Sequence, residues 1–279
     1  MGPPSTRACS ALAAALLVTV LACAPVERVR PLVAVSVAPH AYLVERLAGD
    51  RVDVQVMLPA GASPLLYEPT LAQLRALSEA SLYVKVGHPQ FPFEHAWLDS
   101  LLSERPDLPV IDASARLRSE GDDPHVWLVP ANAQSLAVDL AAALGELLPD
   151  AADAIEAQRA ALDRELQALD AELRAILEPA RGERFLVLHP AWGHLAREYG
   201  LVQVAVEADH KEPGVRELAA LINQAAGLRT VFVQPQLDPS SARVVADALG
   251  AQVEVLDPLA KNWDANLRHA ARRIAEAAG

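Results

Sequence analysis

Cysteine is nearly absent from the sequence, and this scarcity limits how the chain can be stabilised. Only Cys9 and Cys23 occur among 279 residues, and Cys9 lies in a segment that we expect to be removed. The mature chain would then keep one cysteine and could form no internal disulfide bond. Its stability must come from hydrophobic packing, and a chain of this length with 52% hydrophobic residues can supply it.

Positive charge and aromatic residues are also scarce. The chain has 24 Lys and Arg against 36 Asp and Glu, which gives a formal net charge of −12. Such a surface repels nucleic acid and anionic lipid headgroups, so we expect no nucleic-acid partner. Aromatic residues make up 4%, and the abundance of Ala, Leu and Val suits helices packed on strands.

The first 22 residues have the pattern of a cleaved signal peptide. Arg7 precedes an apolar run over 11–22 that is too short to cross a bilayer but fits a secretory signal. The run ends in Val20-Leu21-Ala22-Cys23, which resembles the lipobox of bacterial lipoproteins. We therefore expect lipid on Cys23, a tether over 23–31, and a location in the periplasm or at the cell surface. The alternative is a plain secretory signal followed by an incidental cysteine.

Apolar strand patterns alternate with amphipathic helical patterns in both halves of the chain. Strands are predicted near 33–38, 52–58, 82–86 and 110–112, and again near 185–189, 202–207, 230–234 and 252–256. This alternation is typical of parallel sheets covered by helices. We therefore predict an α/β fold with two Rossmann-like domains over 32–148 and 180–279, each with its own hydrophobic core.

One long helix is predicted between the two halves. Residues 150–177 are rich in Ala, Leu, Glu, Gln and Arg with apolar residues at helical spacing, and Glu178-Pro179 ends the pattern. About 28 residues at about 1.5 Å each give about 40 Å, enough to run along both domains. We expect this linking segment, 149–179, to limit domain movement. An ordinary surface helix within one domain is the alternative.

Side chains that can bind metals follow several predicted strands. They are His40, His88 and His125 in the first half and His189, Glu207 and Asp257 in the second. Ligands of open parallel sheets bind beyond the carboxyl ends of the strands. Imidazole together with carboxylate suits a borderline ion such as zinc. The signal from spacing alone is weak, because these residues are far apart and no His-Glu-x-x-His motif occurs.

Six short motifs resemble, in order and spacing, those of the metal-binding proteins of zinc and manganese ABC importers. They are Tyr67-Glu68-Pro69-Thr70, Asp123-Pro124-His125-Val126-Trp127, Leu188-His189-Pro190-Ala191-Trp192-Gly193, Lys211-Glu212-Pro213, Val233-Gln234-Pro235-Gln236 and Leu256-Asp257-Pro258-Leu259. The match covers nearly all of 33–277. The resemblance implies two α/β domains joined by one long helix, a metal in the cleft between them, and a monomer that serves a separate permease and ATPase.

The resemblance assigns the metal ligands to His125, His189 and Asp257. The family's first ligand is a histidine in a Pro-His-x-Tyr-Glu-Pro loop, but Leu65 occupies that position here. Three explanations remain open. His40 fills the gap and restores a tetrahedral zinc set, or Glu68 or a water completes a weaker site, or the metal role is degenerate. His88 and His95 are lesser candidates.

The residues around the ligands sharpen the functional prediction. His189 in place of the glutamate found in some relatives favours Zn²⁺ over Mn²⁺, since harder oxygen ligands suit manganese. Trp127 and Trp192 adjoin the ligands and are expected, with Glu68 and Glu207, in the cleft. His194, His210 and His269 are expected to be ordinary polar positions.

The predicted function is therefore zinc binding and delivery to a permease, without catalysis. One alternative is a metal-blind or adhesin-like lipoprotein. The other is a three-ligand zinc hydrolase, in which Glu68 or Glu207 would serve as general base.

Overall fold

The computed structural model describes residues 2, 30–117, 123–207 and 214–279. The predicted signal peptide, Cys23 and His210 lie outside the described residues. Within the described ranges no helix has both the length and the apolar character needed to cross a bilayer.

The first half of the chain forms one parallel sheet. Its strands are β1 (Leu32–Val35), β2 (Asp53–Val56), β3 (Leu82–Lys85) and β4 (Val110–Asp112), in the order β2-β1-β3-β4. The helices are α1 (Ala38–Ala48), α2 (Leu71–Glu79), a π-helical segment (Glu94–Leu98), α3 (Asp99–Ser103) and α4 (Pro130–Leu147).

The second half repeats this topology. Its strands are β5 (Arg184–Val187), β6 (Val202–Ala205), β7 (Thr230–Val233) and β8 (Gln252–Val255), in the order β6-β5-β7-β8, all parallel. The helices are α6 (Gly193–Tyr199), α7 (Val215–Gln224), α8 (Ser240–Leu249) and α9 (Trp263–Ala277). The prediction of two parallel-sheet α/β units is confirmed.

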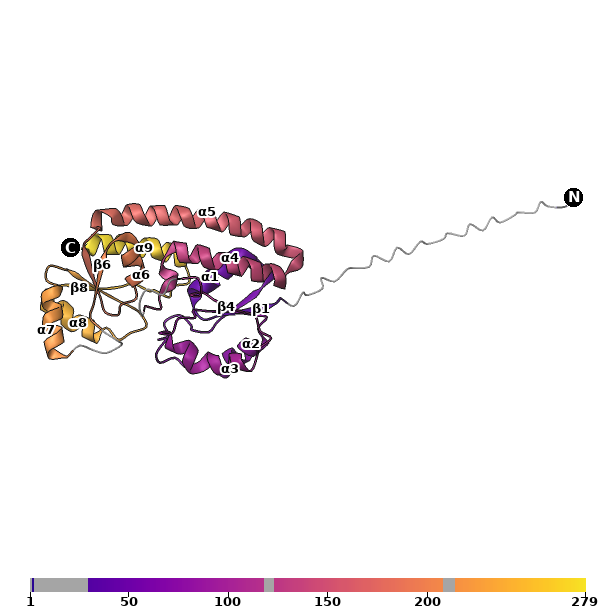
Figure 1. Cartoon of the computed structure of the whole chain (residues 1–279), viewed down its shortest axis with the longest axis horizontal. Helices are drawn as coiled ribbons and strands as arrows, with labels where there is room; N and C mark the ends of the chain where they lie inside the picture. Colours follow the sequence, from indigo (N-terminus) through magenta and orange to yellow (C-terminus); the bar gives the residue numbers. More distant parts are fainter. Residues whose placement is uncertain (1, 3–29, 118–122, 208–213) are drawn as a thin grey trace.

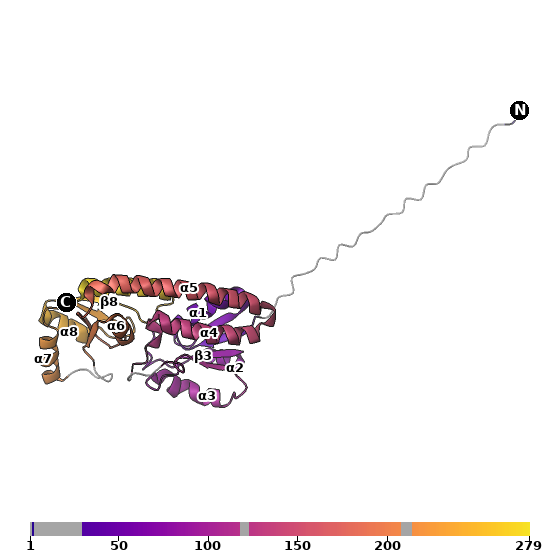
Figure 2. The ribbon, with the colours of Figure 1, turned by 45° about the horizontal axis from the view of Figure 1, so that its top comes forward.

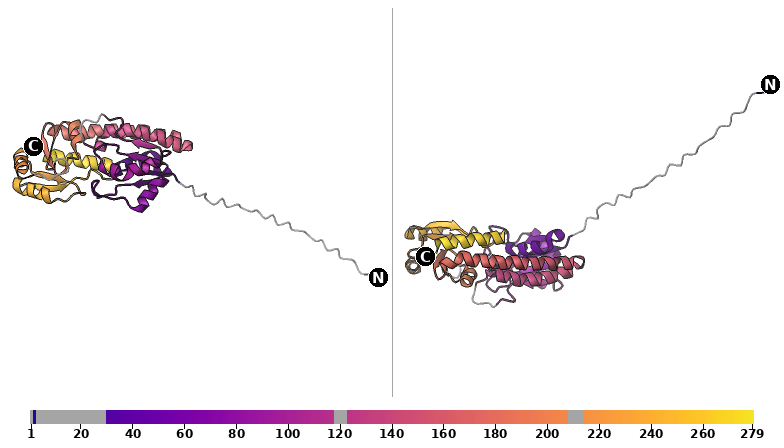
Figure 3. Two further views of the ribbon diagram at one scale, coloured as in Figure 1. Left: turned by 60° about the horizontal axis from the view of Figure 1, so that its bottom comes forward. Right: turned by 90° about the horizontal axis from the view of Figure 1, so that it is seen from above.

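Helix α5 (Ala152–Leu177) runs along both units, as predicted (Figures 1 and 2). Its buried residues recur every three, four or seven positions and form one apolar stripe: Ile155, Leu162, Leu166, Leu169, Leu173 and Leu177. Helix α4 packs on α5 beside the first sheet and α9 packs on it beside the second (Figure 3). Burial of this stripe therefore fixes how the two halves are oriented.

Ion pairs supplement the apolar stripe of α5 in both halves. Glu165 pairs with Arg46 of α1 at 2.6 Å, and Glu172 pairs with Arg268 of α9 at 2.7 Å. These pairs are substantially exposed, and exposed ion pairs contribute about 0–1 kcal/mol each. Hydrophobic packing therefore carries most of the attachment.

The larger hydrophobic cluster crosses from one half to the other, which differs from the expected core for each domain. It joins both faces of the first sheet to α5, α9 and residues such as Phe185, Trp192 and Phe232 of the second unit. A smaller cluster, with Leu186 and Val231, covers the other face of the second sheet. The reason is α5, because its apolar stripe lines a shared layer that neither half encloses alone.

Helix α1 buries a histidine in its first turn. His40 is 1% exposed and lies among Leu43, Leu136 and Trp263 beside a cavity of about 10 Å³. The Val84 carbonyl lies near the ring, but neither ring nitrogen forms a hydrogen bond of acceptable geometry with any residue that the structure describes. Burial, only partly offset by that carbonyl, lowers the pKa of His40 to about 4.

Substitution of Leu169 by alanine should test the shared layer. Leu169 is 1% exposed, so the change should lower the free energy of unfolding by about 2–5 kcal/mol. Chemical denaturation should still give one transition, because the same cluster stabilises both halves. Leu71→Ala is the matched control, since Leu71 is 85% exposed. Two separate transitions, or equal effects of the two changes, would contradict the shared layer.

The stability of the protein should depend on pH through His40. The unfolded chain takes up this proton near the ordinary pKa of 6.5, whereas the folded chain takes it up only near 4. Stability should therefore fall as pH drops from about 6.5 to about 4, by about 3 kcal/mol in total. Denaturation of wild type and His40→Leu across this range measures the difference.

A second histidine provides a control of opposite sign. The pKa of His95 is raised by its hydrogen bond to Asp99, so His95 adds stability at low pH that is lost as pH rises. His95→Leu should therefore shift the pH dependence in the other direction. The assignment to His40 is wrong if His40→Leu leaves the acid-side loss of stability unchanged.

Candidate metal centre

Four polar side chains lie in a row at the carboxyl edge of the second sheet. Glu207 follows β6, His189 follows β5, Gln234 follows β7 and Asp257 follows β8. Backbone hydrogen bonds continue the sheet up to them, from Glu207 N to Leu188 O, Leu188 N to Phe232 O and Leu256 N to Val233 O. Because the strands are parallel and adjacent, one edge collects all four residues.

The first half contributes His125 to this edge. His125 directly precedes the 3₁₀ turn Val126–Leu128 that leads into α4. The ring centroids of His125 and His189 lie 5.5 Å apart, although the two residues belong to different units. Both side chains are largely buried, with His125 7% exposed. The fold therefore brings together one imidazole from each half.

A carboxylate contacts Nδ1 of each imidazole. Asp123 Oδ1 lies 2.7 Å from Nδ1 of His125, and Glu207 Oε2 lies 3.3 Å from Nδ1 of His189. A carboxylate there favours the tautomer with its proton on Nδ1, so that Nε2 carries the lone pair that a metal requires. Histidines that bind metals are commonly oriented in this way.

The protonation states of this pair also suit a metal ligand. Burial lowers the pKa of His125 and outweighs the opposing hydrogen bond and charge of Asp123, so the imidazole stays neutral over a wider range of pH. Burial would raise the pKa of Asp123, but the hydrogen bond and charge of His125, with the charge of His194, lower it overall. Asp123 therefore remains an acceptor.

Asp123 is held across the interface between the two units. His194 of α6 lies with Nε2 2.9 Å from the Asp123 carbonyl oxygen, and its side chain is 15% exposed. A Cβ atom at Gly193 would lie 2.6 Å from Asp123 Oδ2, so only glycine allows this approach. The sequence had assigned no role to Asp123 and an ordinary polar role to His194. The Asp-Pro-His motif was the available signal for Asp123.

Asp257 is oriented by its own loop. Its Oδ1 accepts hydrogen bonds from Gln236 Nε2 at 2.7 Å and from the backbone N–H of Leu259 at 2.9 Å. The next two residues, Pro258 and Leu259, line the cavity between the halves. Among the described residues no three His, Cys, Asp or Glu side chains form a group arranged to hold one ion. The structure thus pairs His125 with His189, whereas Asp257, expected as the third ligand, does not line their cavity because Gln236 and its own loop hold its carboxylate.

The cavity between His125 and His189 is small and mostly apolar. Its free space is about 30 Å³, room for a metal ion and one or two waters, since one water needs about 10–15 Å³. It is lined by Ser63, Pro64, Leu65, Gln90, Phe91, Pro92, Pro124, His125, Trp127, His189, Gln234, Leu237, Pro258 and Leu259. Such a site fits a bare ion and excludes a bulky organic ligand.

One wall of this cavity is fixed by a buried carboxylate. Glu94 accepts hydrogen bonds from the backbone N–H groups of Val86 and Gly87 at 2.6 and 2.9 Å, and from the Ser36 hydroxyl. Burial raises the pKa of Glu94 in spite of these bonds. The contacts anchor the loop after β3, which carries Phe91 and Pro92 to the cavity.

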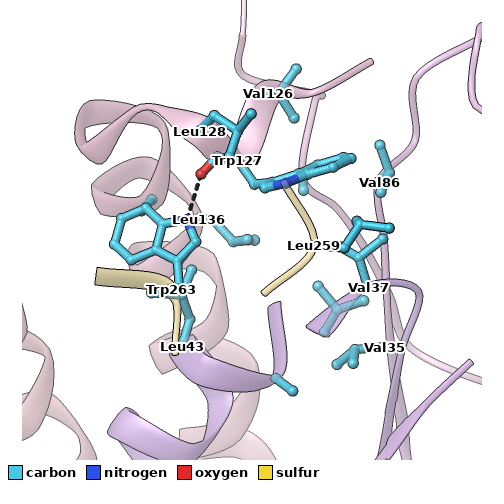
Figure 4. Packing of buried hydrophobic residues seen from close by; sticks show 14 of the residues in the cluster. Val35, Val37, Leu43, Val86, Val126, Trp127, Leu128, Leu136, Leu259 and Trp263 are labelled. Atoms are coloured by element: carbon cyan, nitrogen blue, oxygen red, sulfur yellow. Dashed lines mark hydrogen bonds between the residues drawn. The ribbon is translucent and has the colours of Figure 1, made fainter. Parts of the chain in front are cut away.

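The tryptophans interlock the two halves behind the cavity. Trp127 Nε1 donates to the Pro258 carbonyl at 2.7 Å. Trp263 Nε1 donates to the Trp127 carbonyl at 2.8 Å, the bond drawn in Figure 4. The Trp127 ring also contacts His125, with centroids 5.3 Å apart. Trp192 is 1% exposed and packs in the larger cluster.

Several expected residues are not brought to the cavity. Leu65 lines it, but Glu68 is exposed and does not. His40 lines the separate cavity described above, because α1 begins at Ala38 and its first turn packs His40 against Trp127. His88 is buried in its loop, where its Nδ1 accepts from Gln90 N, and His95 pairs with Asp99. None of these four candidates therefore supplies the ligand that is missing where Leu65 stands.

Known zinc-uptake proteins resemble this chain over most of its length. Residues 33–277 match the family model "Zinc-uptake complex component A periplasmic". The high-affinity zinc uptake system protein ZnuA of Paracoccus denitrificans is 28% identical over 88% of each chain. The zinc-binding lipoprotein AdcA of Streptococcus pneumoniae is 27% identical over 79% of this chain, which spans 48% of AdcA.

A solved structure gives the same result. A zinc-bound deletion variant of ZnuA superimposes with a TM-score of 0.82 and 39% identity, over 89% of this chain and 98% of that one. The sequence match and the fold, with its two parallel sheets and long helix, therefore agree. The chain therefore belongs to the periplasmic zinc-uptake family, the zinc-type solute-binding components of ABC importers.

Proposed function

We propose that this chain binds one Zn²⁺ between its halves, through Nε2 of His125, Nε2 of His189 and the carboxylate of Asp257. The observation that carries the proposal is the pair of imidazoles, one from each half, each with a carboxylate at Nδ1. Two nitrogen ligands and one carboxylate match the donors that zinc accepts. His189 in place of a carboxylate favours Zn²⁺ over Mn²⁺.

Burial of His125 supports metal binding at this proposed site near neutral pH. The lining is largely apolar, and His125 is held neutral by its surroundings. A neutral imidazole offers its lone pair without first losing a proton, so metal binding and protonation compete only weakly near neutral pH. Zinc bridging the halves would stabilise one relative arrangement, and handover follows if the permease favours another.

The proposed protein is the component of an importer that carries zinc to the permease from outside the membrane. We propose that the permease and ATPase are separate chains, that the protein is a monomer, and that lipid on Cys23 ties it to a membrane in the periplasm or at the cell surface. The lipobox-like Val20-Leu21-Ala22-Cys23 supports the anchor, as does the lipoprotein AdcA among the relatives. The proposed domains are 32–148 and 180–279, with 149–179 as the linking segment.

The hydrolase alternative loses support from the placement of its candidate bases. Glu68 is exposed and does not line the cavity, and Glu207 contacts Nδ1 of His189. A general base must reach the proton that it removes, which Glu68 does not do from this position. We therefore propose binding without catalysis.

Zinc titration of the mature protein tests the site directly. Wild type should bind one Zn²⁺, and His125→Ala or His189→Ala should weaken binding at least about 100-fold, since loss of even an outer partner costs about 10–100-fold. Competition with a chelator of known affinity measures the change. His269→Ala is the control, because His269 is exposed on α9. Retained affinity in both site variants would refute the proposal.

Asp123→Asn should separate orientation from coordination. Asparagine keeps the size of the side chain but removes the charge that favours the proton on Nδ1 of His125. We expect zinc affinity to fall by about 10–100-fold with stoichiometry unchanged. Asp107→Asn, at an exposed aspartate, is the matched control. An unaltered dissociation constant would show that Asp123 does not act through His125.

A further inference from the structure

Gln234 occupies the central position of the second sheet's carboxyl edge. It follows β7, between His189 on the neighbouring β5 and Asp257 on the neighbouring β8. Its side chain lines the cavity that His125 and His189 line. The topology therefore places an amide between two of the proposed metal ligands.

The amide of Gln234 is buried and incompletely satisfied. Gln234 is 8% exposed, and its Nε2 makes no hydrogen bond within the described part of the chain. A buried polar group without a partner costs about 1–3 kcal/mol, so an interaction within the cavity would recover stability. A half-turn about the Cγ–Cδ bond exchanges the amide nitrogen and oxygen, so this position can present a donor or an acceptor.

The other polar side chains around the cavity are less suited to this role. The Ser63 hydroxyl already accepts from the backbone N–H of Leu65 at 3.3 Å, and Gln90 is exposed. Leu65 itself cannot coordinate. Gln234 is thus the buried, cavity-lining amide that faces a site lacking its fourth protein ligand.

The size of the cavity determines how Gln234 would contribute. About 30 Å³ is enough for an ion and one or two waters, at about 10–15 Å³ for each water. We propose that Gln234 holds a water molecule in the coordination position that Leu65 leaves open, an inference that rests on the proposed zinc site. After the half-turn the amide oxygen occupies the buried position of Nε2 and accepts a hydrogen bond from this water, and the water oxygen binds the metal.

A neutral amide also sets the charge of the site. The proposed ligands comprise two neutral imidazoles and one carboxylate, and Gln234 adds no charge to them. A glutamate of the same size would add a second hard anionic oxygen, which favours manganese relative to zinc. Gln234 is therefore a specificity-determining residue as well as a positioning one.

The experiment compares wild type with Gln234→Ala and Gln234→Glu in the mature protein. Gln234→Ala should weaken Zn²⁺ binding about tenfold, as expected for one lost hydrogen bond to a metal-bound water. The visible absorption of bound Co²⁺ should change, because it reports ligand number and geometry. Gln234→Glu should raise the Mn²⁺ affinity relative to the Zn²⁺ affinity. Gln252→Ala, at an exposed glutamine at the start of β8, should change neither property.

A second background isolates the water. Leu65→His places an imidazole at the cavity and supplies the fourth ligand directly, so zinc affinity should rise. In that background Gln234→Ala should cost much less than its tenfold effect in wild type, because the water is replaced. Thermal unfolding of the metal-free variants checks that each one folds.

The outcomes distinguish this inference from the proposed function. If wild type binds no zinc, both fall. If wild type binds zinc and His125→Ala abolishes binding, but Gln234→Ala leaves the affinity and the Co²⁺ spectrum unchanged, only the role of Gln234 is overturned. An equal effect of Gln234→Ala with Leu65 and with Leu65→His would also overturn it.

Discussion

The hydrogen-bonded pair of tryptophans is the constraint on which the site depends. Trp127 belongs to the segment that carries His125, and its indole N–H binds the carbonyl of Pro258, the residue after Asp257. Trp263 in turn binds the Trp127 carbonyl. Each bond joins the two halves of the chain and is buried. If it were broken, a buried polar group would lack a partner, which costs free energy. These bonds therefore hold the segments that carry the proposed ligands His125 and Asp257 in a fixed relative position without a metal ion.

The same constraint explains why the apolar layer is continuous. Trp263 begins α9 and packs with Tyr42 of α1, at a ring distance of 5.7 Å, while the rest of α9 lies against α5. The first residue of the last helix, Trp263, thus packs in the core of the first half. We expect the cleft between the halves to change shape only by small movements. A larger rotation of one half against the other would expose the apolar stripe of α5 to water.

Much of the fold was predictable from the sequence, and the reason is periodicity. Strand runs such as Leu82–Lys85 and the helical stripe of α5 are local patterns that the structure retains. His125, His189 and Asp257 could be singled out as candidates from the motifs and from their places after strands, and the structure brings His125 and His189 together. Contacts between segments that are distant in the sequence produce no local pattern from which they could be predicted. The link from His194 to Asp123 joins residues 71 positions apart, and the packing of His40 behind Trp127 depends on where α1 begins.

The position of Trp263 has a consequence for how the protein comes to be made. The first sheet's core includes side chains from the final helix, Trp263 and Leu267 among them. A chain that enters its compartment amino terminus first cannot complete that core until nearly its last residue has crossed. Folding that begins at the amino terminus therefore leaves this core open until α9 is available, which ties completion of the first half to the last helix of the chain.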